Sequence, residues 1–159
     1  MAYGLDAFAT EVQLAYDPAL VTPTQKLSAT ERPYAYAMQW GSMPATKALT
    51  NLMLKGVVAR YATSPFRVDG KDYPAGTILL MRADNRKHSD FDAVVKEVAN
   101  SSVVPFTPIR TGFVESGKDF GSYDYELVRR PKVLALAGEG VRSLNLGEIW
   151  HFFEEELRY

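Results

Sequence analysis

A helix with clear signals at both of its ends limits how this chain can fold. Ser42 offers an N-cap and Pro44 stands in the first turn. Apolar residues then recur at helical spacing as far as Gly56: Ala45, Ala48, Leu49, Leu52 and Met53. The pattern predicts an amphipathic helix over residues 43–55, which must bury its apolar stripe against a sheet or another helix.

Apolar runs stand on both sides of this helix. "YAYAMQW" precedes it and "VVARYA" follows it, and each has the composition of a buried strand. A strand, a helix and a strand in succession predict a right-handed crossover that lays the two strands parallel. Further strands are predicted at "TILLM" and "VVPF", and a hairpin turn at Asp69-Gly70. A helix is predicted over residues 89–100, capped by Ser89 with Asp92 at the third position. The predicted fold is therefore α/β: a mostly parallel open sheet of about five strands, with helices packed on it and a small β-hairpin insertion.

Changes in composition divide the chain into four segments. Residues 1–32 are interpreted as a lead-in arm, with a short strand as an option at "EVQLAYD", and residues 33–110 as an α/β accessory domain. Residues 111–131 lack clear periodicity, which is typical of a linker. Residues 132–159 are interpreted as the first β-α unit of a further, truncated domain, with a strand at "KVLALAGEG" and a helix near 145–157.

The last helix has an apolar face that is predicted to pack inward: Leu146, Ile149, Trp150, Phe153 and Leu157. The strand before it has no sequence neighbour to pair with on its far side. Open strand edges of this kind favour pairing between chains, so a homodimer is a possible assembly.

Charge and composition exclude several classes of function. The chain has 18 basic and 19 acidic side chains and a formal charge of -1, so no strong field attracts nucleic acid. It has no cysteine, which excludes disulfides, thiolate metal sites and a cysteine nucleophile. No apolar run approaches the roughly 20 residues of a membrane-spanning helix. We therefore predict neither a nucleic-acid partner nor a membrane partner.

His151 and Glu154 form an H-x-x-E pattern, the spacing of two zinc ligands in one class of metallopeptidase. A zinc site needs a third protein ligand, and the only other histidine, His88, stands in the hydrophilic stretch "RADNRKHSD". We interpret the pair as part of a solvated helix face, and we predict no metal site and no catalytic residue in this chain.

A weak candidate for ligand binding is the turn that contains Gly138, Gly140 and Arg142. Glycines between a strand and a helix can leave backbone N–H groups free for an anion, and the arginine would assist. The spacing departs from G-x-G-x-x-G because Ser143 stands at the third glycine position. A tight turn with positive φ is the alternative. In the binding-module hypothesis, the basic stretch near Arg82 completes a small-molecule pocket.

The segment 107–131 carries acidic and aromatic side chains without periodicity. Its acidic residues, Asp119, Asp124 and Glu126, are interpreted as solvated loop charge. Its aromatic residues are interpreted as a packing surface against another domain: Phe113, Phe120, Tyr123 and Tyr125.

Several stretches together resemble the region that follows the peptidase domain in large bacterial zinc carboxypeptidase-like proteins. They are "AYGLDAFAT", "YAYAMQW", "FRVDGKDYPAGTILLMR" and "DFGSYDYELVRRPKVLALAGEGVRSLNLGEIWHFFEEELRY". Within the last stretch, "PKVLALAGEGV" and "GEIWHFFE" resemble the opening β-α unit of a class I glutamine amidotransferase-like domain appended to those peptidases.

The resemblance implies that the chain is a non-catalytic accessory fragment of a zinc-dependent metallocarboxypeptidase, with a mid-protein start after Met1. Its partner would be the catalytic peptidase domain, which would hold the zinc, and the parent would be exported to the periplasm or outside the cell. No motif of the peptidase domain has a counterpart here, so no catalytic residue is carried over and the fragment alone is expected to be inactive.

Overall fold

The computed structural model describes residues 9, 11, 12, 27 and 32–159. The strands are β1 (Ala35–Met38), β2 (Arg60–Ala62), β3 (Phe66–Val68), β4 (Lys71–Tyr73), β5 (Ile78–Met81), β6 (Phe106–Ile109) and β7 (Tyr125–Leu127). The helices are α1 (Met43–Leu54), α2 (Phe91–Ser101) and α3 (Ser143–Trp150), and α3 continues into a π-helical turn, η1 (His151–Glu156). The predicted strand at "EVQLAYD" lies outside the described residues except for Glu11 and Val12, which form a bend.

The main sheet is antiparallel, so the prediction of a mostly parallel sheet is wrong. Its five strands lie in the order β6-β1-β5-β2-β7, and every neighbouring pair runs antiparallel. Strands β1 and β2 do run in the same direction, because each is antiparallel to β5. They are not neighbours, however, since β5 lies between them, with Leu79 opposite both Ala37 and Arg60.

The hairpin between β2 and β5 explains this arrangement. The chain reverses at Asp69 and Gly70, which have φ values of 49° and 71°, and β3 pairs with β4 in a separate two-stranded sheet. Strand β5 then returns between β1 and β2. The units β1-α1-β2 and β5-α2-β6 are thus both split by a strand of the other, which is the ferredoxin-like arrangement, with β7 added beside β2.

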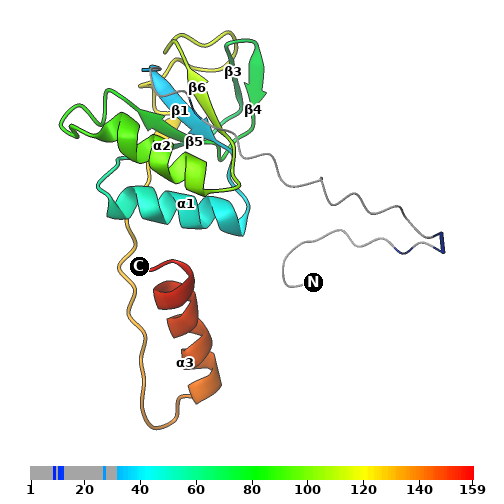
Figure 1. Ribbon diagram of the computed structural model, residues 1–159, viewed down its shortest axis with the longest axis vertical. Coiled ribbons are helices and arrows are strands. Elements are labelled where there is room, and N and C mark those ends of the chain that lie inside the picture. The colour runs from blue at the N-terminus through cyan, green and yellow to red at the C-terminus, as the bar shows by residue number, and fades with distance from the viewer. Residues whose placement is uncertain (1–8, 10, 13–26, 28–31) are drawn as a thin grey trace.

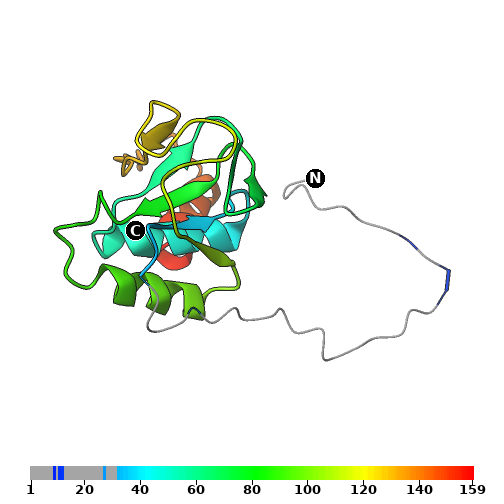
Figure 2. The ribbon, with the colours of Figure 1, turned by 90° about the horizontal axis from the view of Figure 1, so that it is seen from above.

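Helices α1 and α2 cover one face of the sheet (Figures 1 and 2). The Ser42 Oγ accepts a hydrogen bond from the Ala45 N–H at 3.2 Å, which confirms the predicted N-cap of α1. The buried side chains between the helices and the sheet include Tyr36, Leu52, Leu80, Val95 and Phe106. The N-cap of α2 is Asp90, not the predicted Ser89, and its side chain makes no capping bond.

The hairpin and the connection from β6 to β7 cover the opposite face of the sheet. Phe66 stacks on Tyr73 with ring centroids 4.9 Å apart, and Phe120 meets Tyr125 edge-on at 5.0 Å. Parts of the segment predicted as a linker therefore belong to this second cluster, to which Val114 and Phe120 also contribute. Both faces of β1 and β5 are buried as a result. A double-sided apolar pattern is typical of parallel sheets, so it gave no sign that an antiparallel strand lies between the two strands of the predicted crossover.

The C-terminal segment, residues 129–159, hangs away from the sheet (Figure 1). Residues 131–137 are extended but form no strand, so the predicted strand at "KVLALAGEG" is wrong for this chain. A glycine turn follows, and then α3. The side chains of Lys47 on α1 and Glu156 in η1 form an ion pair that links the two parts. In the part of the chain that the structure describes, no helix is long and apolar enough to span a membrane.

Candidate functional site

The glycine turn predicted to bind a ligand is fully open. Gly138 and Gly140 have φ values of 125° and 88°, which non-glycine residues rarely adopt. The Val141 N–H donates to the Gly138 carbonyl at 3.2 Å and closes the turn. Arg142 is the N-cap of α3, but its side chain makes no capping bond. All three predicted residues are exposed, and a Cβ added at either glycine would meet nothing within 4 Å. The three residues therefore lie in one turn, but no surrounding residues enclose a binding site there.

His151 and Glu154 of the H-x-x-E pattern are both exposed in η1. The other histidine, His88, lies elsewhere, where its Nε2 donates to the Lys55 carbonyl at the end of α1 at 2.9 Å. Among residues 9, 11, 12, 27 and 32–159, no group of three histidine, aspartate or glutamate side chains is placed to hold a metal ion.

The basic stretch near Arg82 has an internal structural role. Arg82 donates from both Nη atoms to the Asp92 carboxylate, at 2.9 and 2.7 Å, and from Nε to the Pro33 carbonyl at 3.0 Å. The Tyr36 hydroxyl donates to the same carboxylate at 2.9 Å. These hydrogen bonds, with that from Arg82 the strongest, hold the pKa of Asp92 below its ordinary value. The guanidinium is therefore occupied and does not reach the glycine turn.

The acidic residues of the loop also have partners within the fold. The Asp119 Oδ1 accepts from the Val114 N–H at 2.8 Å, and a Glu126 oxygen accepts from the Tyr61 hydroxyl at 2.6 Å. The Asp124 carbonyl accepts from the Thr63 N–H at 2.8 Å. These contacts order the loop and bring the three carboxylates to no common centre.

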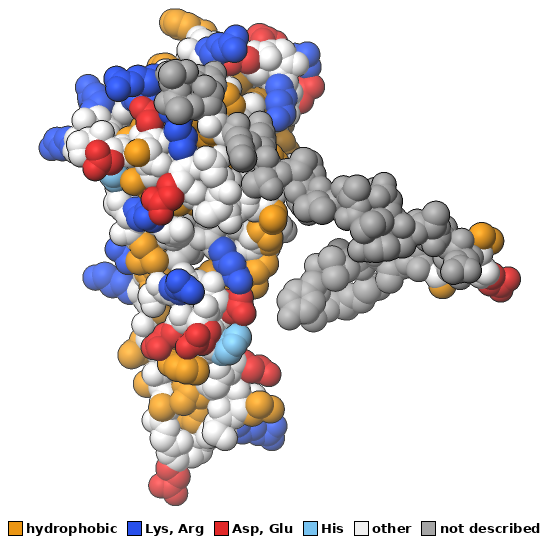
Figure 3. Space-filling view, in the orientation of Figure 1, with side chains coloured by type: hydrophobic (Ala, Val, Ile, Leu, Met, Phe, Trp, Pro, Cys, Tyr) orange, Lys and Arg blue, Asp and Glu red, His pale blue; other side chains and the backbone are white. Residues whose placement is uncertain are grey.

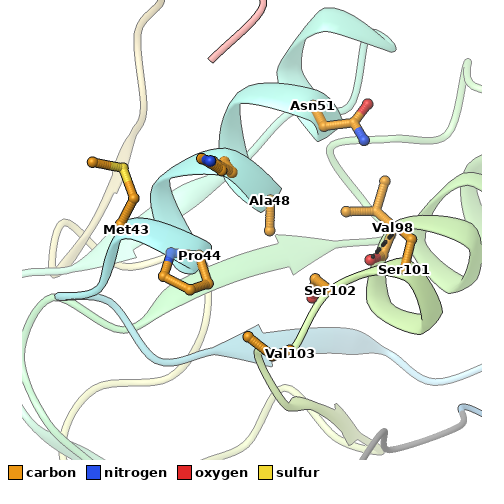
Figure 4. Close-up of a pocket in the computed structure, with 9 residues that line it drawn as sticks. Met43, Pro44, Ala48, Asn51, Val98, Ser101, Ser102 and Val103 are labelled. Atoms are coloured by element: carbon orange, nitrogen blue, oxygen red, sulfur yellow. Dashed lines mark hydrogen bonds between the residues drawn. The ribbon is translucent and has the colours of Figure 1, made fainter. Parts of the chain in front are cut away.

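A groove lies between α1 and α2 (Figure 4) and has a volume of about 310 Å³. It is lined by Met43, Pro44, Lys47, Ala48, Asn51, Val98, Ser101, Ser102 and Val103. The Ser101 hydroxyl donates to the Val98 carbonyl at 3.1 Å, and Lys47 at the rim pairs with Glu156. A small-molecule site needs several polar groups that converge on the ligand. In this groove the Ser101 hydroxyl and the Lys47 ammonium already bind other groups of the protein, so they do not converge on a ligand.

The largest set of unburied apolar side chains lies on the C-terminal segment, and we call it the C-terminal apolar surface. It consists of Val133, Leu134, Leu136, Leu144, Ile149 and Trp150, which are 47, 86, 75, 73, 46 and 52% exposed. Figure 3 shows hydrophobic side chains exposed over this part of the molecule. None of the residues of α3 is buried, so the prediction that its apolar face packs inward is wrong within this chain.

The backbone of the extended segment 132–137 also lacks partners within the described part of the chain. No described residue makes a hydrogen bond with any N–H or C=O group of this segment. Val133 and Ala135 line a groove of about 460 Å³ against α3, together with Leu146, Trp150 and Phe153. Leu134 and Leu136 point the other way, into solvent. These residues therefore alternate like those of a strand, but no strand of the described chain lies beside either edge of the segment.

The chain matches no protein-family model, no curated protein and no solved structure.

Proposed function

We propose that this chain is a non-catalytic accessory module that packs against the catalytic domain of an exported zinc-dependent metallocarboxypeptidase. The single observation that supports the packing role is the C-terminal apolar surface. Six apolar side chains remain roughly half exposed or more beside an unpaired extended segment. Large exposed apolar patches of this kind mark interaction sites in proteins. The type of parent enzyme is supported by the resemblance of the sequence stretches described above.

The chemistry of the surface defines what would cover it. Side chains on both faces of residues 133–137 are apolar, and α3 lies along only one of these faces. A strand with two apolar faces is stable only in a sheet that is covered on both sides. The partner would therefore supply backbone groups for the two open edges and an apolar layer for Leu134 and Leu136.

Titration of the chain with a zinc carboxypeptidase domain from the same genome tests the proposal. Trp150 lies within the surface and is 52% exposed, so its emission reports docking if the other tryptophan is removed by Trp40→Phe. We expect a saturable blue shift that Leu134→Gln with Leu136→Gln abolishes. Leu54→Gln is the matched control, because Leu54 is 40% exposed but lies on α1. Equal loss of binding in this control, or no binding by the unaltered chain, would contradict the proposal.

The non-catalytic part of the proposal has its own test. We expect the isolated chain to hydrolyse no peptide and to carry no stoichiometric zinc, because His151 and Glu154 are exposed and lack a third ligand among the described residues. One zinc per chain by metal analysis, lost on His151→Ala, would overturn it.

The positive φ of Gly138 and Gly140 keeps a second proposal open, in which the chain is a regulatory module whose glycine turn binds a small anion. Thermal unfolding with inorganic phosphate and with small carboxylates tests this. A melting temperature that rises with ligand concentration by mass action, and that Arg142→Ala reduces, supports binding. An unchanged melting temperature leaves the packing role alone.

A further inference from the structure

The two edges of the main sheet differ in how far they are closed. At the β6 edge, Pro108 has no N–H to donate, the Arg110 N–H is bound by the Asp69 carboxylate at 2.9 Å, and Lys71 binds Thr107 at 3.0 Å. The other edge, β7, has no proline within Tyr125–Leu127, and Leu127 is 48% exposed. The Tyr125 carbonyl at the start of β7 accepts from Arg60 Nη1 at 2.9 Å, so among the described residues this second edge is open to another strand from Leu127 onward.

Hydrogen-bonded positions alternate along an antiparallel pair, which shows where the backbone of β7 points. The Val128 N–H donates to the Ala59 carbonyl at 2.9 Å, and the Thr63 N–H donates to the Asp124 carbonyl at 2.8 Å. Leu127 falls on the alternate position, so its N–H and C=O point away from β2. Among the described residues, none makes a hydrogen bond with the backbone N–H or C=O of Leu127 or Arg129. Both residues therefore present outward backbone groups.

We propose that two copies of this chain form a dimer by antiparallel pairing of their β7 edges about a two-fold axis at Val128. In this register Leu127 of one copy exchanges backbone hydrogen bonds with Arg129 of the other. The two Val128 side chains meet at the axis. Each copy also has a shallow hollow at this edge, lined in part by Arg60, Tyr61 and Arg129, in which the second copy would lie.

Charge complementarity selects this occupant and this register. With Val128 on the axis, Glu126 of each copy lies directly opposite Arg130 of the other, so the symmetric contact contains two ion pairs of opposite charge. Glu126 uses one oxygen to accept from Tyr61, while its Oε1 makes no bond with a described residue. Arg130 lies over the ring of Tyr159, with 5.4 Å between the guanidinium carbon and the ring centroid, and its charge remains unpaired among the described residues.

Sedimentation equilibrium measures the dimer directly. We expect a monomer–dimer equilibrium for the unaltered chain, and Leu127→Pro should abolish it because proline removes only an outward N–H. Arg130→Glu should weaken the dimer by roughly tenfold, since two attractive pairs become repulsive. Glu126→Arg combined with Arg130→Glu should restore it. Arg129→Glu is the control with the same change of charge at a position without an opposing carboxylate, and it should weaken the dimer less.

Cross-linking tests the register, because the chain has no cysteine of its own. Residues on the axis at a non-hydrogen-bonded position have Cα atoms about 4.5 Å apart, within the range that a disulfide spans. Val128→Cys should therefore form a dimeric disulfide on mild oxidation. Arg130→Cys should not, but Glu126→Cys with Arg130→Cys in one chain should.

Three results would overturn the dimer: a chain that stays monomeric at millimolar concentration, a Leu127→Pro variant that dimerises like the unaltered chain, or equal cross-linking at positions 128 and 130. The second result would place the contact elsewhere, for example on segment 132–137. Circular dichroism of each variant shows that the sheet is intact. None of these results bears on docking to a catalytic domain, so this inference and the proposed function fail independently.

Discussion

The sheet domain, residues 33–128, and the C-terminal segment, residues 129–159, contain similar apolar side chains but treat them differently. Leu79 and Leu80 on β5 are completely buried, whereas Leu134 and Leu136 are 86 and 75% exposed. In the sheet domain each strand has neighbours, and layers cover both faces. The segment has one helix and one extended run, which cannot bury each other fully. Apolar composition alone therefore does not create a core, because burial requires complementary layers.

The largest expected effect comes from truncating one leucine in each region. Leu80→Ala should reduce the free energy of unfolding by about 2–5 kcal/mol, because it leaves a cavity in the main core. Leu134→Ala should change it by less than about 0.5 kcal/mol. Denaturation by urea measures both values. Equal losses would show that segment 132–137 is buried in solution.

Two ion pairs, one within the sheet domain and one that links it to the C-terminal segment, give a second comparison, with smaller expected changes in the free energy of unfolding. Asp92→Ala removes the acceptor of Arg82 and Tyr36 and should cost about 1–3 kcal/mol, since a partly buried guanidinium is left unpaired. Glu156→Ala removes the exposed pair with Lys47 and should cost at most about 1 kcal/mol. A double-mutant cycle on each pair gives the coupling energies, and a stronger coupling for Lys47 with Glu156 would break the comparison.

A pH titration at high pH tests the loop that covers the second face of the sheet. The Tyr125 hydroxyl donates to the Lys118 carbonyl at 2.7 Å, and burial, with the charges of Asp124 and Asp119, raises its pKa from 10.0 to about 12. Because the folded protein holds this proton more tightly than the unfolded chain, the contribution of Tyr125 to stability is fully present below pH 10 and is lost as the pH rises towards 12. Tyr125→Phe should remove this part of the alkaline loss. Tyr123→Phe, at a 99% exposed residue, should not.

At low pH the sign is the opposite for Asp92, whose pKa is lowered by Arg82. The folded protein binds this proton less tightly than the unfolded chain, so the contribution is present above the ordinary pKa of 3.8 and is lost as the pH falls below it. Asp92→Asn should flatten the stability profile in that window. If the loss of stability at low pH were the same in Asp92→Asn, the ion pair between Asp92 and Arg82 would not persist in solution.

The sequence predicted local structure better than strand pairing. Helix α1 and the hairpin at Asp69-Gly70 were predictable because their signals are local: the Ser42 cap, Pro44 and an Asp-Gly turn. Strand direction was not, because it depends on where β5 inserts, and no local pattern encodes that choice. The three-residue strand β7 was missed, although the alternation of apolar and acidic side chains at Tyr125, Glu126 and Leu127 was a weak signal.

For the candidate sites, the sequence predicted the environment of one residue but not that of the others. His151 lies on the exposed helix face that was predicted, whereas Gly138 and Arg142 lie in the predicted turn without surrounding residues that could enclose a ligand. The ion pair of Asp92 was not predictable from the sequence either. As the third residue after Ser89 it resembled part of a cap, whereas its carboxylate pairs with Arg82 across the fold. The sequence predicted the C-terminal apolar surface only indirectly, through a strand that has no sequence neighbour with which to pair.

Native-state hydrogen exchange of the monomeric chain at low concentration tests the central contrast most directly. We expect the amides of β1 and β5 to exchange only through global unfolding, and those of residues 132–137 to exchange nearly as fast as in an unfolded peptide, because no described group binds them. Slow exchange across residues 132–137, comparable with that of β5, would contradict the account.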